Sequence, residues 1–421
     1  MKPRALAIAI LTICGGAAHA QDFQLHGFLD LRAVSAPGET SWDDGGLGKS
    51  RYGSGDVGVR IGGAALAARW QVTPALSAVA DLQYQPDERQ HFDVLDAYLR
   101  LRPASITPWR WSLKVGAFFA PISLENEGIG WTSLWTLTPS AINSWVGEEL
   151  RTVGGEFSIE HRGASTFQAG FAVFGKNDPA GELLATRGWS LSDLTSGLRA
   201  SVREPDVYAP RVSTEAPVDY RPFDGIDHRP GWYADASWES PAYGKIVLLR
   251  YDNRADPQRW ESYDDRRVFA WHTRFWSLGA RTRVGDVALI AQAMDGDTAF
   301  EPVPELYLDT HFRAGFLLAG WERGAWRPAL RVDFFSLRQT PSSLPDPLGE
   351  HGNAITAALN WRPNDRLRIT GEWLRIDSTR SQRLLESAAM DGRFHAQGLR
   401  TNGLAPRQID RQVQLSARVY F

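Results

Sequence analysis

The chain has 421 residues, with 46 basic and 49 acidic side chains and a formal net charge of −3. This nearly balanced charge gives no reason to expect nucleic acid as a partner. The sequence is rich in aromatic residues, with 17 Trp, 19 Phe and 11 Tyr, yet its mean hydropathy is −0.31 and no apolar run is long enough for a membrane-spanning helix.

Residues 1–20 have the pattern of a secretory signal peptide. A basic start is followed by a short apolar run and by "AHA", a small-residue cleavage site that ends at Ala20. We predict cleavage after Ala20. The single cysteine, Cys14, would leave with the signal, so residues 21–421 would form the exported domain and contain no disulfide.

Polar and apolar residues alternate along about sixteen segments, as expected for strands with one apolar and one polar face. In the first segment, for example, Leu25, Leu29 and Leu31 share one face. The predicted strands begin at Phe23 and then cover residues 56–72, 75–85, 92–102, 109–119, 152–162, 166–175, 231–239, 245–253, 268–284, 286–294, 307–319, 325–337, 353–361, 366–376 and 408–421.

The connections between these strands alternate between short and long. Short ones lie near residues 72–75, 103–108, 162–165, 240–244, 284–286, 322–325 and 362–365; long ones lie near 35–55, 120–151, 176–230, 253–267, 295–306, 338–352 and 377–407, with a compact one at 86–91. This sorting predicts an all-β, antiparallel, up-and-down transmembrane barrel of about 16 strands, whose short turns lie on one side of the membrane. A large periplasmic all-β protein is the alternative, but it has no reason to sort loop lengths by end.

Tryptophan positions agree with the barrel. Six of them lie within a few residues of a short turn, where the amphipathic rings of a barrel form a girdle at the membrane interface. They are Trp70, Trp109, Trp238, Trp321, Trp326 and Trp361.

The last strand, "RQVQLSARVYF", ends on an aromatic residue after alternating apolar positions: Val413, Leu415, Ala417, Val419 and Phe421. In a closed barrel it must pair with the first strand and remove both edges. This ending resembles that of the Gram-negative outer-membrane porins. The resemblance implies a location in the cell outer membrane, contact with its lipid, recognition of the terminus by the outer-membrane insertion machinery, and a homotrimer.

A second segment, "GAFFAPISLE", resembles the G-x-F-x-x-P-x-x-x-E segment of the phosphate-selective porin O/P family. The resemblance implies that a strand ends here and that a constriction loop folds into the pore. Only four lysines follow residue 20, so the lysine-rich phosphate site of that family is not carried over. The matching residues are Gly116, Phe118, Pro121, Ser123 and Glu125.

The loop that follows, residues 120–151, is rich in aromatic and aliphatic residues, so we expect it to pack inside the barrel. A short helix is predicted near Ser140–Asn143. Besides Pro121, its candidate site residues are acids that we predict to face the pore, the alternative being that they face outside water: Glu125, Glu127, Glu148 and Glu149.

Strand parity places a set of basic side chains in the lumen: Lys114, Arg250, Arg274, Arg313 and Arg331. Acids predicted at similar depth are Asp96, Asp235, Asp333 and Glu372. Arginines facing an acidic loop would create a transverse field, and basic rings favour anions in pores. The alternative is that these charges only pair across strands.

The sequence therefore predicts a porin: a water-filled channel for passive diffusion of small hydrophilic solutes or ions, with a lean towards anions. No cofactor, metal site or catalytic motif is expected, and we predict that the chain is not an enzyme. Asp346, Glu350 and His351 share a loop but are expected to be solvated. The second interpretation is a non-conducting adhesin or scaffold barrel that acts through the 176–230 loop.

Overall fold

The computed structural model describes residues 23–203, 219–263, 266–301, 307–340, 349–380 and 407–421. The predicted signal peptide and Asp346 lie outside the described residues. None of the described helices has the length and apolarity needed to cross a bilayer.

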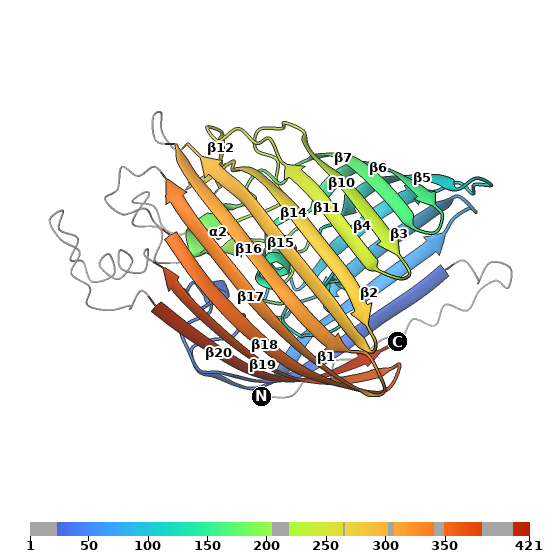
Figure 1. Ribbon diagram of the computed structural model, residues 1–421. Coiled ribbons are helices and arrows are strands. Elements are labelled where there is room, and N and C mark those ends of the chain that lie inside the picture. Colours follow the sequence, from blue (N-terminus) through green and yellow to red (C-terminus); the bar gives the residue numbers. More distant parts are fainter. Residues whose placement is uncertain (1–22, 204–218, 264–265, 302–306, 341–348, 381–406) are drawn as a thin grey trace, which may run out of the picture.

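Sixteen antiparallel strands form a closed barrel (Figure 1), which confirms the predicted fold. In order around the wall they are β1 (Phe23–Ala36), β2 (Asp56–Gln71), β3 (Leu76–Tyr84), β4 (Phe92–Leu101), β5 (Trp109–Phe118), β6 (Thr152–Arg162), β7 (Thr166–Gly175), β10 (Gly231–Ser240), β11 (Gly244–Asp252), β14 (His272–Val284), β15 (Val287–Phe300), β16 (Leu308–Trp321), β17 (Trp326–Thr340), β18 (Gly349–Asn364), β19 (Leu367–Arg380) and β20 (Arg407–Tyr420).

The remaining described elements belong to the connections. Two small sheets pair β8 (Val202–Arg203) with β9 (Asp219–Tyr220), and β12 (Trp260–Tyr263) with β13 (Arg266–Phe269). The helices are η1 (Trp42–Asp44), α1 (Ala141–Glu149) and α2 (Glu182–Arg187).

The barrel closes between β20 and β1, and the last residue takes part in the closure. Gly27 and Phe421 exchange two backbone hydrogen bonds of 3.0 and 3.1 Å. Glycine suits this position, because a Cβ on Gly27 would come within 2.5 Å of the Phe421 ring and within 2.7 Å of the Ala65 carbonyl oxygen. The aromatic terminus is thus part of the wall.

On the lumen side of this seam lies a buried polar group, the seam cluster, formed by Asp30 and Arg32 of β1 with Ser416 and Arg418 of β20. The Asp30 carboxylate accepts hydrogen bonds from Ser416 at 2.5 Å, Arg32 at 2.7 Å and Arg418 at 2.9 Å. Three donors from two strands satisfy one buried carboxylate, as burial of a charge requires.

The alternation of exposed and buried residues along β20 shows which face of the wall points outward and which points into the lumen. Val413, Leu415 and Val419 are about half exposed on the outside, whereas Gln412 and Gln414 are buried on the lumen side. An apolar exterior and a polar interior are typical of a barrel in lipid.

The fold gives a direct test of which side of the membrane each rim occupies. With the orientation typical of outer-membrane barrels, whose short turns face the periplasm, a peptide tag inserted between Pro363 and Asn364 is expected to be hidden from antibody on intact cells and accessible after permeabilisation. A tag between Gln258 and Arg259, in a long connection, is the matched control and should be labelled on intact cells. Labelling of the first tag on intact cells would reverse the assigned orientation.

Candidate functional site

The connection between β5 and β6, residues 119–151, folds into the barrel and is called the inserted loop. Gly116 positions its start: the φ angle is +139°, and a Cβ would come within 2.2 Å of the Ala97 carbonyl oxygen. Within the loop, α1 is capped by Ser140, whose Oγ accepts from the Asn143 backbone N–H. The predicted loop and its helix are therefore present.

The loop is held by an aromatic core. The Trp145 side chain is fully buried, with its ring centroid 5.1 Å from Phe312 and 5.7 Å from Phe275 of the wall. These phenylalanines point inward, so the lumen face of β14–β17 is partly apolar. Where the wall contacts the inserted loop, its lumen face carries apolar side chains, whereas a wall in contact with water would carry polar ones.

Arg331 fastens the inserted loop to β17. Its guanidinium donates to Glu125 at 2.7 Å and to the carbonyl oxygens of Thr138 and Pro139 at 2.7 and 2.9 Å, and it pairs with Asp333 at 2.8 Å. The side chains of Arg331 and Glu125 are both fully buried. Arg331 faces inward, as predicted. Its guanidinium N–H groups, however, donate to the inserted loop and to the wall, so this side chain holds the loop in place.

Strands β18 and β19 hold the same loop at further points. The Glu372 carboxylate accepts from the backbone N–H of Leu137 at 2.5 Å and from the Thr138 hydroxyl at 2.7 Å. The Asn360 amide donates to the Trp135 carbonyl at 2.8 Å. Glu372 and Asp333, predicted as pore acids, are likewise buried anchors of the loop.

The two glutamates at the end of α1 are buried as well. Glu148 pairs with Arg187 at 2.7 Å, and Glu149 accepts from Trp145 Nε1 at 2.6 Å and from the Tyr220 hydroxyl at 2.7 Å. Burial raises the pKa of Glu148 to about 7, although Arg187 favours its charged form. Contrary to the prediction, Glu125, Glu148 and Glu149 do not face open water, because other loop and wall residues cover them.

A second inserted segment, residues 177–203 with α2, lies inside the barrel towards the long-loop end (Figure 1), and most of its side chains are buried. Asp193 pairs with Arg32 of the seam cluster at 2.6 Å and with Arg51 at 3.2 Å. The Leu198 backbone N–H donates to the Val94 carbonyl of β4 at 2.9 Å. Sequence reasoning placed this stretch in an outer loop; its tryptophan and leucines were the signal that could have shown its burial.

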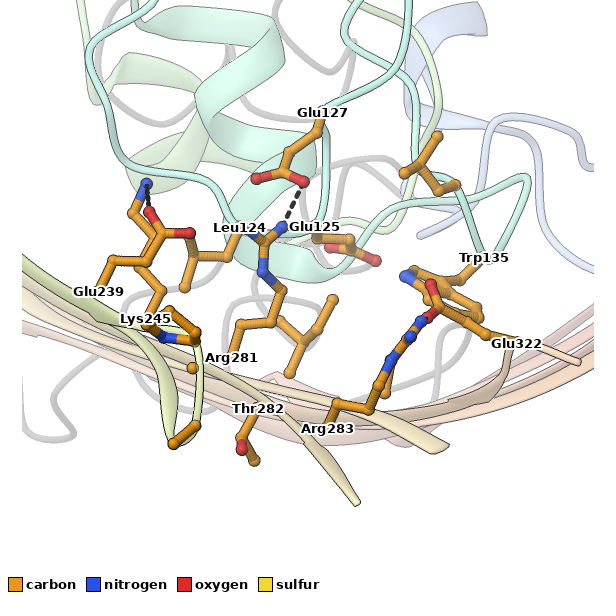
Figure 2. Close-up of a pocket in the computed structure, with 16 residues that line it drawn as sticks. Leu124, Glu125, Glu127, Trp135, Glu239, Lys245, Arg281, Thr282, Arg283 and Glu322 are labelled. Carbon is orange, nitrogen blue, oxygen red and sulfur yellow. Dashed lines mark hydrogen bonds and ion pairs between the residues drawn. The ribbon is translucent and has the colours of Figure 1, made fainter. Parts of the chain in front are cut away.

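Glu127 is the acid of the inserted loop whose side chain remains exposed, at 37%. Figure 2 shows it reaching Arg281 of β14, with which it forms an ion pair. The two residues line a cavity of about 280 Å³, together with Lys245 and Arg283 from the wall. An acidic residue of the loop therefore does lie against basic residues of the wall. These are Lys245, Arg281 and Arg283, none of which was predicted from the sequence as a pore residue.

Three predicted pore bases lie on the outside of the barrel. Arg250 pairs in register with Trp276, which is 50% exposed, while Arg274 and Arg313 alternate with the buried Phe275 and Phe312. The assignment of these residues to the lumen is wrong because the aromatic side chains of β14 and β16 face the inserted loop. The charged residues that alternate with them therefore lie on the outer face. Arg250, Arg274 and Arg313 therefore do not form the predicted lumen wall.

The water-accessible basic wall lies elsewhere, on the inner face of β2, β4 and β5. Arg69 is exposed and Arg100 and Arg110 are partly exposed, and none of them forms a salt bridge with a described residue. Arg100 lies directly opposite Lys114, a predicted site residue, which pairs with Glu156 at 3.0 Å. The alternation of inward and outward residues along these three strands could have placed Arg69, Arg100 and Arg110 in the lumen from the sequence alone.

Acidic side chains lie on the same inner wall, further from the short turns. Asp81 and Asp96 face each other across β3 and β4, and Asp235 lies on β10 next to Gly170 of β7. Asp96 and Asp235 thus lie inward, and the charge of this wall changes sign along the barrel axis.

The described residues contain no group of three or more His, Cys, Asp or Glu side chains that could hold a metal ion. Glu350 pairs with Lys49 inside the barrel, and burial lowers the pKa of that lysine to about 8. His351 lies on the outward face beside it.

Comparisons with known proteins support the fold. No protein-family model and no curated protein matches the sequence. Among solved structures, the chain is similar to OmpF of Salmonella typhi, determined with daunomycin, with 12% identity, a TM-score of 0.51, and coverage of 95% of this chain and 97% of that one. It is also similar to the outer-membrane channel DcaP of Acinetobacter baumannii, with 8% identity, a TM-score of 0.50 and the same coverage.

Proposed function

We propose that the protein is a porin that lets small hydrophilic solutes cross the outer membrane by passive diffusion, without catalysis. The observation that carries this proposal is the charged inner wall of β2–β7, which stays accessible to water beside the inserted loop. Where the wall packs against the inserted loop it is partly apolar, and its charged residues, such as Arg331 and Asp333, are buried and paired. Arg69, Arg100 and Arg110, by contrast, keep exposed surface without an ion-pair partner among the described residues.

We further propose that the channel prefers anions, through Arg69, Arg100 and Arg110. These three arginines lie near the short-turn end of the lumen, where they attract anions and repel cations. The field is screened over about 8 Å at physiological salt, so the preference should weaken as salt rises.

A family relation to the phosphate-selective porins O/P remains part of the proposal. It is supported by Gly116, which lies against the Ala97 carbonyl two residues before β5 ends, and by Ser123, whose Oγ accepts from the backbone N–H of Glu125 and Asn126 at 3.1 and 2.8 Å. The same motif thus shapes the loop entrance, and it carries no claim of phosphate selectivity.

The anion preference is tested by reversal potentials in a salt gradient. The triple variant Arg69→Gln, Arg100→Gln, Arg110→Gln should shift selectivity towards cations, because the acids of the wall remain. The double variant Arg274→Gln, Arg313→Gln removes outward charges and should leave the reversal potential unchanged. Equal reversal potentials for the parent and the triple variant would show that these arginines do not set selectivity.

The second candidate, a non-conducting scaffold, is favoured by the deep packing of the second inserted segment. Trp189 is fully buried there, and its indole N–H donates to the Ser336 carbonyl at 3.0 Å. Single-channel recording separates the two functions: a diffusion channel gives discrete conductance steps, and a scaffold gives none.

A further inference from the structure

The outer face of β19 and β20 carries a basic patch near the long-loop rim, here called the rim patch: Arg375, Asp377, Arg407 and Arg411. The residues that alternate with these along both strands are buried on the lumen side, so the four side chains point away from the barrel. They therefore face whatever surrounds the protein in the membrane.

The level of the rim patch follows from the aromatic residues beside it. Trp373, 39% exposed, lies two positions below Arg375 on the same face, and Phe334 of β17 and Trp276 of β14 are exposed further around the wall. Two strand residues rise about 5 Å along a tilted strand. Because such rings lie at the headgroup level, the arginines lie at or just beyond that level.

The rim patch has more positive than negative charge. Arg375 and Arg411 are directly opposite each other across β19 and β20, an arrangement that destabilises a sheet when the charges are alike. Asp377 is the acid of the patch, and it already pairs with Arg375 at 2.9 Å and Arg407 at 2.8 Å. Arg411 forms no ion pair with a described residue.

Other outward arginines of the same rim are balanced by acids. Arg274 pairs with Asp297 at 3.8 Å, and Arg313 pairs with Asp295. The rim patch is therefore not explained by its height on the barrel alone, because Arg411, opposite Arg375, has no acidic partner among the described residues.

We propose that the rim patch binds the phosphate groups of lipid headgroups in the leaflet on its long-loop side. Guanidinium groups donate paired hydrogen bonds to phosphate oxygens, and a phosphate between Arg375 and Arg411 converts their repulsion into attraction. Lipid is the source because the patch lies on the outer wall beside apolar strand positions such as Val413. This inference does not depend on whether the barrel conducts.

The test compares lipid retention by the full-length barrel in mixed nanodiscs, measured by native mass spectrometry. The parent should enrich phosphatidylglycerol over the zwitterionic phosphatidylcholine. The double variant Arg375→Gln, Arg411→Gln should lose this enrichment by about thirtyfold. The matched control Arg274→Gln, Arg313→Gln and the conservative variant Arg375→Lys, Arg411→Lys should retain most of it.

Thermal unfolding in neutral detergent adds a readout that a folding defect would not reproduce. The glutamine variant should be at least as heat-resistant as the parent there, because the like-charge pair is gone. Phosphatidylglycerol should then raise the unfolding temperature of the parent but not that of the glutamine variant. Equal enrichment by parent and variant, or equal stabilisation of the parent by inorganic phosphate at the same concentration, would overturn the proposal.

Discussion

An Arg331→Met variant is expected to lose about 3–5 kcal/mol of unfolding free energy, the usual cost of removing one partner from a buried ion pair. The carboxylates of Glu125 and Asp333 would remain buried without their shared cation, and two loop carbonyls would lose a donor. Denaturant unfolding in detergent, followed by tryptophan fluorescence, measures the difference.

The same variant should change the channel, because Arg331 holds the inserted loop against β17. Release of the loop should make single-channel currents larger and noisier than those of the parent. Arg274→Met, which removes an exposed arginine from the outer face, is the matched control and should change neither stability nor current appreciably. Parent-like stability of Arg331→Met would mean that the loop is held mainly by its aromatic core.

Deletion of Phe421, the residue after β20, is expected to reduce the amount of assembled barrel in cells more than a single-residue change within β20. The deletion removes the two backbone hydrogen bonds with Gly27, worth about 2 kcal/mol together. We also expect the deletion to weaken recognition of the terminus by the insertion machinery, as the resemblance to porins implies. The measurement is the fraction of heat-modifiable barrel on gels from cell envelopes.

A substitution on the other side of the seam separates these two causes. Gly27→Val leaves the terminus intact but places side-chain atoms against the Phe421 ring, so it damages closure alone. Both variants should give a smaller fraction of folded barrel when purified protein is refolded into detergent. In cells, the deletion should reduce the fraction of assembled barrel more than Gly27→Val does. Equal assembly of parent and deletion variant would show that neither closure nor recognition depends on Phe421.

The wall could be predicted because barrel strands repeat one simple pattern. Alternation, turn lengths and the seam residues follow from the contrast between lipid outside and polar lumen inside, and β20 satisfies that contrast along its length. The pattern is weakest where both faces carry apolar residues. That occurs on β14 and β16, where Phe275 and Phe312 pack against Trp145 and the outward Arg274 and Arg313 were assigned to the lumen.

The candidate site was harder to predict because it depends on what fills the barrel. Parity placed Arg331 and Glu372 inward correctly, yet nothing in their own strands indicates that loop carbonyls and amides would occupy them. The burial of Glu148 depends on Arg187, 39 residues away in the sequence. Contacts of this kind are set by the path of two long segments, which local periodicity does not encode.

The seam cluster has a consequence for the order of events during folding. Arg32 is shared between Asp30 at the seam and Asp193 of the second inserted segment, and Asp30 in turn needs Arg418 from the last strand. Since the first and last strands are the most distant in sequence, their pairing carries the greatest loop-closure entropy and is expected to come late. Before closure, the second inserted segment would therefore lack the completed network that joins Asp193 to the seam through Arg32, and this contact would reach its final geometry only when β20 pairs with β1.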